Sequence, residues 1–266
     1  MISCKEYVDI KKKELKEKIS KLEDKPRLCV IQVGDNPAST SYINGKKKDC
    51  AEVGIECEHI KLPEDITQRA LEAHIKLQAA LLCNSGIIVQ LPLPKHIDAE
   101  RVEKLIPKEK DVDGFRVDSP FNPCTPQGII DWLKYNNYDF VGKYVVVLGR
   151  SKIVGKPLVN MLIDEGATVT CCNSHTTFAW EMTKDADVVI SAIGKPKYIK
   201  KKYFTNQTVV VDVGINRDEN GKLCGDVDVD KLSGLDNVYV TPVPGGVGLL
   251  TRYALLENTY KATLIK

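Results

Sequence analysis

The sequence lacks a long apolar run, and charges of neither sign dominate it. No run reaches the roughly 18 apolar residues that a membrane span needs, and residues 1–18 contain no stretch resembling a signal peptide. We therefore expect a cytoplasmic protein with no membrane partner. The 38 basic and 36 acidic residues leave a formal net charge of +2, so nucleic acid is not expected as a partner.

The sequence also lacks regular patterns of metal-binding residues. Its nine cysteines are odd in number and irregularly spaced, and none belongs to a CxxC pair. Its four histidines are scattered along the chain. Neither arrangement is typical of a zinc site or of a disulfide framework, so we expect no metal.

Short apolar runs alternate with helical patterns along the whole chain, which is typical of parallel sheets with crossover helices. The first half predicts helices over 38–53 and 67–82, and strands over 28–33, 56–62 and 86–91. The second half predicts a helix through Ile163 and strands over 144–148, 167–172, 187–192, 209–213 and 238–241. We predict an α/β protein of two domains, an α/β catalytic domain and a Rossmann-like dinucleotide-binding domain with a parallel sheet, divided near Asn136 and Asn137.

A glycine-bearing turn follows the strand over 144–148, with the sequence GRSKIVGKP at 149–157. It is not the GxGxxG fingerprint, but Gly149 permits a tight turn and Gly155 permits close packing of the next helix. The N-terminus of that helix would offer N–H groups to a phosphate. The alternative is a tight turn without a ligand.

The next strand ends at Cys172-Asn173-Ser174 without the acidic residue that usually binds the ribose of NAD. Arg150 and Ser174 could instead contact an additional phosphate, through a charge and a hydroxyl. This pattern favours NADP over NAD. The alternative is that Arg150 is an ordinary solvated loop residue.

Polar residues also gather in the first half of the chain. Tyr42 and Lys46 are four apart in a predicted helix and therefore share a face. Gln90 lies at the carboxyl end of a predicted strand, where α/β sheets bind ligands. Asp111 and Asp113 lie in a loop that contains a glycine. Spacing alone leaves open a half-exposed Tyr–Lys pair and a simple Asp-x-Asp-Gly turn.

The motifs taken together resemble the bifunctional methylenetetrahydrofolate dehydrogenase and methenyltetrahydrofolate cyclohydrolase family. The matching segments span nearly the whole chain in the order of the family: VGDNPASTSYINGKKK at 33–48, VQLPLP at 89–94, KDVDGF at 110–115, PCTPQGI at 123–129, GRSKIVGKP at 149–157, DVGIN at 212–216 and TPVPGGVG at 241–248.

The resemblance implies NADP-dependent oxidation of methylene-tetrahydrofolate to methenyl-tetrahydrofolate, and hydrolysis of that product to formyl-tetrahydrofolate, in one-carbon metabolism. It implies a folate-binding catalytic domain over 1–137 with 249–266, and an NADP-binding Rossmann-like domain over 138–248. It also implies a tetrahydrofolate substrate in the cleft between the domains, NADP as the cofactor and a homodimer as the common state of the family.

The resemblance further implies roles for individual residues. Lys46 is assigned proton transfer, Tyr42 and Gln90 shape its surroundings, and Asp113 holds the pterin ring. The substrate-binding positions are Tyr42, Lys46, Val89, Gln90, Leu91, Asp113, Pro244 and Gly245. The positions lining the NADP site are Gly149, Arg150, Ser151, Ser174 and Ile215.

Three segments depart from the usual family pattern: Ile2-Ser3-Cys4-Lys5 near the start, Asn173 before Ser174, and Leu249-Leu250 after Gly248. None of them removes a proposed catalytic group. The sequence admits two other functions. Another two-domain NAD(P) dehydrogenase would not explain Tyr42, Lys46, Gln90 and Asp113 together. A non-catalytic folate- or nucleotide-binding relative would be favoured by loss of Lys46 or of GRSKIVG, and both are present.

Overall fold

The computed structural model describes residues 1–205, 207–235 and 237–265. Its internal contacts divide the chain into two compact units. The three-stranded unit comprises Asp9–Cys124 and Arg252–Lys266, and the five-stranded unit comprises Met1–Val8 and Thr125–Thr251. The domain limits expected from the sequence remain a proposal. The contacts group three segments of the expected catalytic domain with the five-stranded unit, namely residues 1–8, 125–137 and 249–251.

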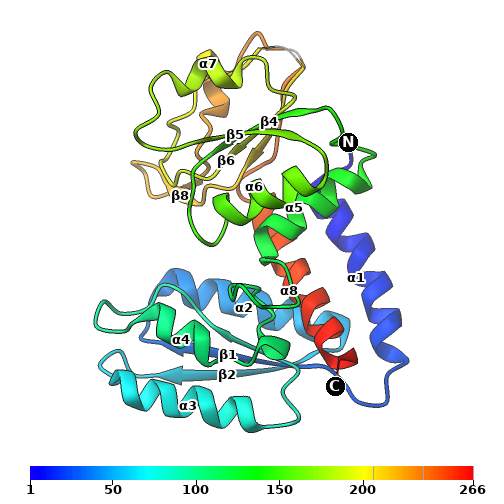
Figure 1. Ribbon diagram of the computed structural model, residues 1–266, viewed down its shortest axis with the longest axis vertical. Helices are drawn as coiled ribbons and strands as arrows, with labels where there is room; N and C mark the ends of the chain where they lie inside the picture. The colour runs from blue at the N-terminus through cyan, green and yellow to red at the C-terminus, as the bar shows by residue number, and fades with distance from the viewer. Residues whose placement is uncertain (206, 236, 266) are drawn as a thin grey trace. The chain divides into compact units, whose positions relative to one another are not determined.

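The three-stranded unit is built on a parallel sheet with the strand order β2-β1-β3. The central strand β1 (Arg27–Val33) is almost wholly buried, as expected for a parallel strand covered on both faces. It pairs with β2 (Glu56–Leu62) and β3 (Gly86–Val89). The crossover helices α2 (Pro37–Val53) and α3 (Gln68–Ala80) lie on opposite sides of these strands (Figure 1).

Local sequence signals set the ends of both crossover helices. The Asn36 side chain accepts the N–H groups of Ala38 and Ser39 at the start of α2, and Gly54 ends that helix in the left-handed conformation. Thr67 caps α3 by accepting the N–H of Ala70. The sequence predicts that Thr67 lies inside the helix, but its extended backbone makes it the cap.

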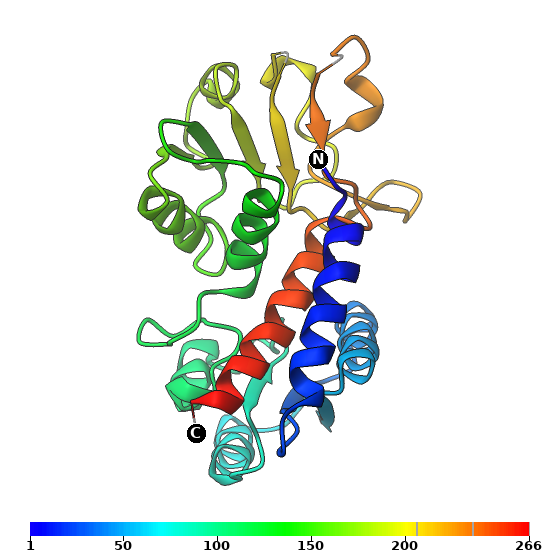
Figure 2. The ribbon, with the colours of Figure 1, turned by 90° about the vertical axis from the view of Figure 1, so that its right-hand side faces the viewer.

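Three further helices contribute to this unit. The short helix α4 (Ala99–Leu105) joins α3 and β1 in one apolar cluster. Parts of α1 (Cys4–Ser20) and α8 (Val247–Leu264) also belong to the unit and run side by side there (Figure 2). Lys12 of α1 and Arg252 of α8 both form ion pairs with Asp49 of α2, at 2.6 and 2.8 Å.

The five-stranded unit has a parallel sheet with the order β10-β7-β6-β4-β5. Its strands are β4 (Tyr144–Leu148), β5 (Thr168–Cys172), β6 (Val188–Ser191), β7 (Val209–Asp212) and β10 (Tyr239–Val240). Its helices are α5 (Cys124–Tyr135), α6 (Gly155–Asp164) and α7 (Ala179–Thr183), together with two 3-10 turns over Lys201–Tyr203 and Val229–Lys231. A small antiparallel pair, β8 (Asn216–Arg217) and β9 (Leu223–Cys224), completes the unit.

The predicted α/β class with parallel sheets is confirmed, and most predicted elements occur within one or two residues of their expected limits. The strand expected over 86–91 ends at Val89, although the Gln90 N–H still donates to Ile31. Among the described residues, no helix has the length and apolar character needed to cross a membrane.

Candidate active site

Lys46 and Gln90 form the centre of a polar site in the three-stranded unit. The Lys46 ammonium on α2 donates a 3.0 Å hydrogen bond to Oε1 of Gln90, directly after β3. The Gln90 amide in turn donates from Nε2 to the Leu91 carbonyl at 2.8 Å. Because the amide nitrogen is engaged in this way, the oxygen is the atom that faces the lysine.

Burial and two neighbouring side chains set the charge state of Lys46. The lysine is 5% exposed, and burial lowers its pKa, while the nearby Asp113 carboxylate opposes that decrease. Its ammonium lies 5.1 Å from the centre of the Tyr42 ring, within the range of a cation–π contact. The helical spacing of Tyr42 and Lys46 therefore brings them together, as the sequence predicted.

The pKa of the half-buried Asp113 carboxylate is set by opposing influences. Burial raises its pKa to about 6, the Lys46 ammonium lowers it, and Asp111 raises it further. Lys46 and Asp113 therefore each favour the charged form of the other in a site that penalises both charges. A lysine and a carboxylate titrating nearer neutrality than usual are typical of functional sites.

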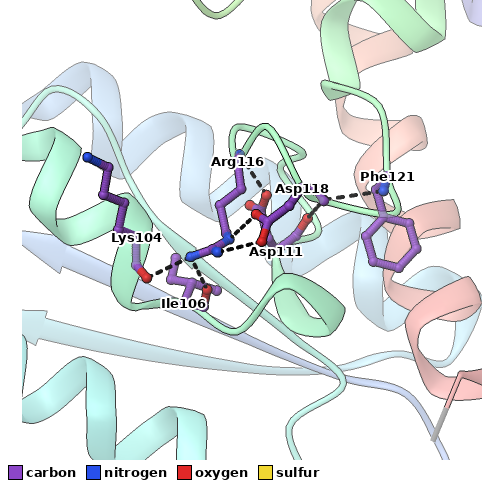
Figure 3. Close-up of polar contacts among 7 residues, drawn as sticks. Lys104, Ile106, Asp111, Arg116, Asp118 and Phe121 are labelled. Atoms are coloured by element: carbon purple, nitrogen blue, oxygen red, sulfur yellow. Dashed lines mark hydrogen bonds and ion pairs between the residues drawn. The ribbon is translucent and has the colours of Figure 1, made fainter.

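The loop that presents Asp113 is held by Asp111 and Arg116 (Figure 3). The buried Asp111 carboxylate accepts the N–H of Arg116 at 2.9 Å. The Arg116 guanidinium pairs with Asp118 and donates to the carbonyl oxygens of Lys104 and Ile106. Asp111 therefore serves the shape of the loop, whereas Asp113 interacts electrostatically with the Lys46 ammonium.

Two further predicted substrate positions lie beside Asp113. Val89 and Leu91, together with Asp113, line a small hollow of about 20 Å³. Asn258 of α8 supports the same region by donating to the Val112 carbonyl at 3.0 Å. Six of the predicted substrate positions thus belong to the three-stranded unit: Tyr42, Lys46, Val89, Gln90, Leu91 and Asp113.

The glycine-bearing turn of the five-stranded unit has the predicted geometry. Gly149 has a φ of 117°, and a side chain there would collide with the Ala192 carbonyl. A side chain on Gly155 would collide with the Gly149 carbonyl, so the helix packs as closely as predicted. The Ser151 hydroxyl accepts the N–H groups of Val154 and Gly155, which leaves its own O–H able to donate to a phosphate.

A cavity of about 480 Å³ opens at the carboxyl ends of β4, β5 and β6. Four of the predicted cofactor positions line it: Gly149, Arg150, Ser151 and Ser174. Asn173 shapes the loop before Ser174, because its side chain accepts the N–H of His175. Within the part of the chain that the structure describes, no acidic side chain pairs with Arg150, so its charge remains available to an anion.

The cavity also contains residues that the sequence did not single out. Lys195 and Lys202 add two cations, and Trp180 and Tyr198 add aromatic faces. Phosphates require cations and donors, whereas nucleotide bases stack on aromatic rings, so this lining fits a dinucleotide phosphate. Of these four residues, only Lys195 lies just after a predicted strand, and that position is the only signal in the sequence for a role in the cavity.

Three predicted positions lie outside both hollows. Ile215 is 61% exposed and does not line the 480 Å³ cavity. Pro244 and Gly245 are exposed in the loop between β10 and α8, within the five-stranded unit. The roles of these residues remain predictions.

The chain resembles known proteins over nearly its full length. Residues 2–113 match the catalytic domain of tetrahydrofolate dehydrogenase/cyclohydrolase, and residues 123–266 match its NAD(P)-binding domain. A bifunctional protein FolD from Bacillus anthracis is 46% identical over 274 residues, covering 98% of this chain and 96% of that protein.

Two solved structures share the fold. The bifunctional FolD methylenetetrahydrofolate dehydrogenase/cyclohydrolase of Campylobacter jejuni is 41% identical, with a TM-score of 0.93 over 99% of this chain and 98% of that one. The enzyme of Trypanosoma brucei, complexed with NADP cofactor and inhibitor, is 32% identical, with a TM-score of 0.93 over 100% and 97% of the two chains.

Proposed function

We propose, from the premise that this chain belongs to the tetrahydrofolate dehydrogenase/cyclohydrolase family, that Lys46 is the proton-transfer residue of its two-step chemistry. The chain is a bifunctional enzyme of one-carbon metabolism. It oxidises methylene-tetrahydrofolate to methenyl-tetrahydrofolate with NADP, and it hydrolyses that product to formyl-tetrahydrofolate. The observation that supports the role of Lys46 is its buried ammonium, bonded to Gln90 and facing Tyr42 and Asp113.

Oxidation requires alignment rather than acid–base chemistry from the protein. When bound, NADP supplies the hydride acceptor. Arg150 and Ser174 would hold the additional phosphate that distinguishes NADP from NAD, and Gly149 would allow the backbone to approach the ligand closely. Asp113 would accept N–H donors from the pterin ring with its two carboxylate oxygens. These hydrogen bonds would hold the folate in position before hydride transfer.

Hydrolysis requires a group that both accepts and returns a proton. Water adds to the methenyl carbon, and the attacking water loses a proton to the Lys46 amine. The Lys46 ammonium then returns a proton to the departing ring nitrogen as the carbon–nitrogen bond breaks, and the carbinol hydroxyl releases its proton to solvent, which leaves the neutral formyl group. Burial makes this possible, because it lowers the pKa of Lys46 and so raises the share of the neutral amine. Gln90 holds the amine in place.

The remaining expectations belong to the same proposal. We propose that the enzyme prefers NADP over NAD, works as a homodimer and acts in the cytoplasm. Pro244, Gly245 and Ile215 are proposed ligand contacts, on their match to the family motifs. Another two-domain NAD(P) dehydrogenase is set aside, because the matches to both family domains span almost the whole chain.

Two absorbance assays test the proposal separately. Methylene-tetrahydrofolate with NADP should give rising near-ultraviolet absorbance, from NADPH and the methenyl product, and NAD in place of NADP should give a slower rise. Methenyl-tetrahydrofolate without any cofactor should lose its absorbance as it is hydrolysed. A non-catalytic folate-binding protein would bind the substrate and give neither signal.

A further inference from the structure

Asp226 has a buried carboxylate that gathers hydrogen-bond donors from two loops. It is 0% exposed and follows β9. Its Oδ2 atom accepts the Ser191 hydroxyl at 3.0 Å and the Ile193 N–H at 2.9 Å, with a longer contact of 3.4 Å to the Gly194 N–H. Its Oδ1 atom accepts the Lys195 N–H at 3.0 Å and the Asn216 amide at 2.9 Å.

The donors belong to segments at the carboxyl ends of β6 and β7. Ser191 ends β6, and residues 193–195 form the loop that follows it. Ile193 and Lys195 of this loop line the 480 Å³ cavity. Asn216 begins β8 and is the neighbour of Ile215. One side chain thus ties a wall of the cavity to the segment after β7.

The donors require a side chain with an acceptor oxygen on both branches at this position. All five groups that bond to the Asp226 carboxylate are N–H or O–H donors, and a carboxylate offers acceptor sites on both oxygens. An amide would turn an NH₂ group toward one set of these donors and leave them unpaired. Bonds from backbone N–H groups to a charged oxygen are also stronger than bonds to a neutral one.

A second carboxylate fixes Asp226 itself. Asp212, at the end of β7, accepts the backbone N–H of Asp226 at 2.9 Å and that of Val227 at 2.8 Å. It also accepts the N–H of Gly214 at 3.0 Å. Asp226 is therefore held by the sheet on one side and holds the loop over 193–195 on the other.

We propose that Asp226 is a positioning residue for the cofactor, because it sets the course of the loop that forms one wall of the nucleotide cavity. It does not line the cavity, so it acts through Ile193 and Lys195. The inference rests on the proposed function in one respect, that this cavity receives NADP. Loss of the carboxylate should misplace the wall and weaken NADP binding while hydrolysis in the three-stranded unit continues.

The experiment measures NADP binding and hydrolysis in the same protein. Trp180 lines the cavity, so NADP titration can be followed by tryptophan fluorescence without any turnover. Asp226→Asn should raise the NADP dissociation constant about tenfold, because a displaced wall would lose contacts with the cofactor on the scale of one charged hydrogen bond. The cofactor-independent hydrolysis of methenyl-tetrahydrofolate should keep its parent rate, which reports an intact three-stranded unit, and the thermal midpoint reports the fold of the whole protein.

Two further variants make the test decisive. Asp230→Asn changes an exposed acid in the same segment, paired with Lys197, and should leave NADP binding unchanged. Ser191→Ala removes one donor to Asp226 and should weaken NADP binding to a lesser degree. If Asp226→Asn does not fold, Ser191→Ala decides, because a raised dissociation constant supports the proposal and an unchanged one overturns it.

A folded Asp226→Asn enzyme that binds NADP as the parent does would also overturn the proposal. A role limited to stability would lower the thermal midpoint and leave the dissociation constant unchanged. A parent enzyme that fails to bind NADP would instead overturn the proposed function, on which this inference depends.

Discussion

The ammonium of Lys46 lies 3.0 Å from the amide oxygen of Gln90, and the amide cannot turn without losing its bond to the Leu91 carbonyl. This relationship fixes a buried amine at the carboxyl end of a parallel sheet, opposite a carboxylate with a raised pKa. The same contact holds Lys46 whether it is charged or neutral, because either form can donate a hydrogen. The residue can therefore exchange a proton without leaving its position.

Arg150 should decide between the two nicotinamide cofactors. Arg150→Ala should weaken NADP binding by about 1.5–3 kcal/mol, the value of a charge-assisted contact, and leave NAD binding nearly unchanged. Fluorescence titration with each cofactor measures both constants. Lys156→Ala, which removes an exposed cation of α6 outside the cavity, is the matched control. Equal losses for NADP and NAD would show that Arg150 does not contact the additional phosphate.

Asp113 should govern folate affinity rather than cofactor affinity. Asp113→Ala removes the acceptor for the pterin ring, so the folate dissociation constant should rise by roughly tenfold or more, on the scale of a hydrogen bond to a charged group. NADP binding in the absence of folate should remain at the parent value. Equilibrium binding of each ligand to the folded variant measures both. Unaltered folate affinity would reject this assignment.

Asp113 should also impose a pH dependence on stability. Burial raises its pKa from 3.8 to about 6, so between these values the folded protein keeps a proton that the unfolded chain has lost. Its contribution to stability is therefore fully present below pH 3.8 and is lost as the pH rises through about 6. In urea unfolding, the free energy of unfolding of Asp113→Asn should increase relative to that of the parent as the pH rises through this range. The increase should be about 1 kcal/mol, after allowance for the partial exposure of Asp113. A gain that does not vary with pH would contradict the raised pKa.

Position 45 should require glycine only because the Arg252 side chain packs directly against it. A side chain on Gly45 would collide with the Arg252 guanidinium, which forms an ion pair with the buried Asp49 at 2.8 Å. Gly45→Ala should therefore cost about 1–3 kcal/mol of unfolding free energy. In an Arg252→Met background the same change should stabilise by up to about 1 kcal/mol, because alanine is the better helix former. A double-mutant cycle in urea measures this change of sign, and equal effects in both backgrounds would contradict it.

The fold could be predicted to the extent that its elements have their own local signals. The apolar strand over 144–148 and the helix over 38–53, which ends before Gly54, can be recognised in the sequence alone. The helix α4 and the two-residue strands β8 and β9 could not, because they are short and are stabilised by tertiary contacts.

The site could be predicted in part, because Tyr42 and Lys46 share one helix and Gln90 follows a recognisable strand. Contacts between distant segments had no signal in the sequence. Asp49 and Arg252 pair across about 200 positions, and Asp226 binds a loop about 30 residues before it. Their side chains meet only because the sheets bring the segments together. Spacing also could not show that Asp111 supports the loop while Asp113 interacts electrostatically with Lys46.

The role of Lys46 is tested most directly by measuring both activities of Lys46→Met at saturating folate. Methionine keeps much of the volume of the lysine stem and removes the ammonium, so the site should remain packed. We predict near-complete loss of hydrolysis with dehydrogenase activity retained, and accumulation of methenyl-tetrahydrofolate. If Lys46 only held the substrate, both activities would fall together. Hydrolysis at the parent rate in the Met variant would contradict the role of Lys46 as the proton-transfer residue.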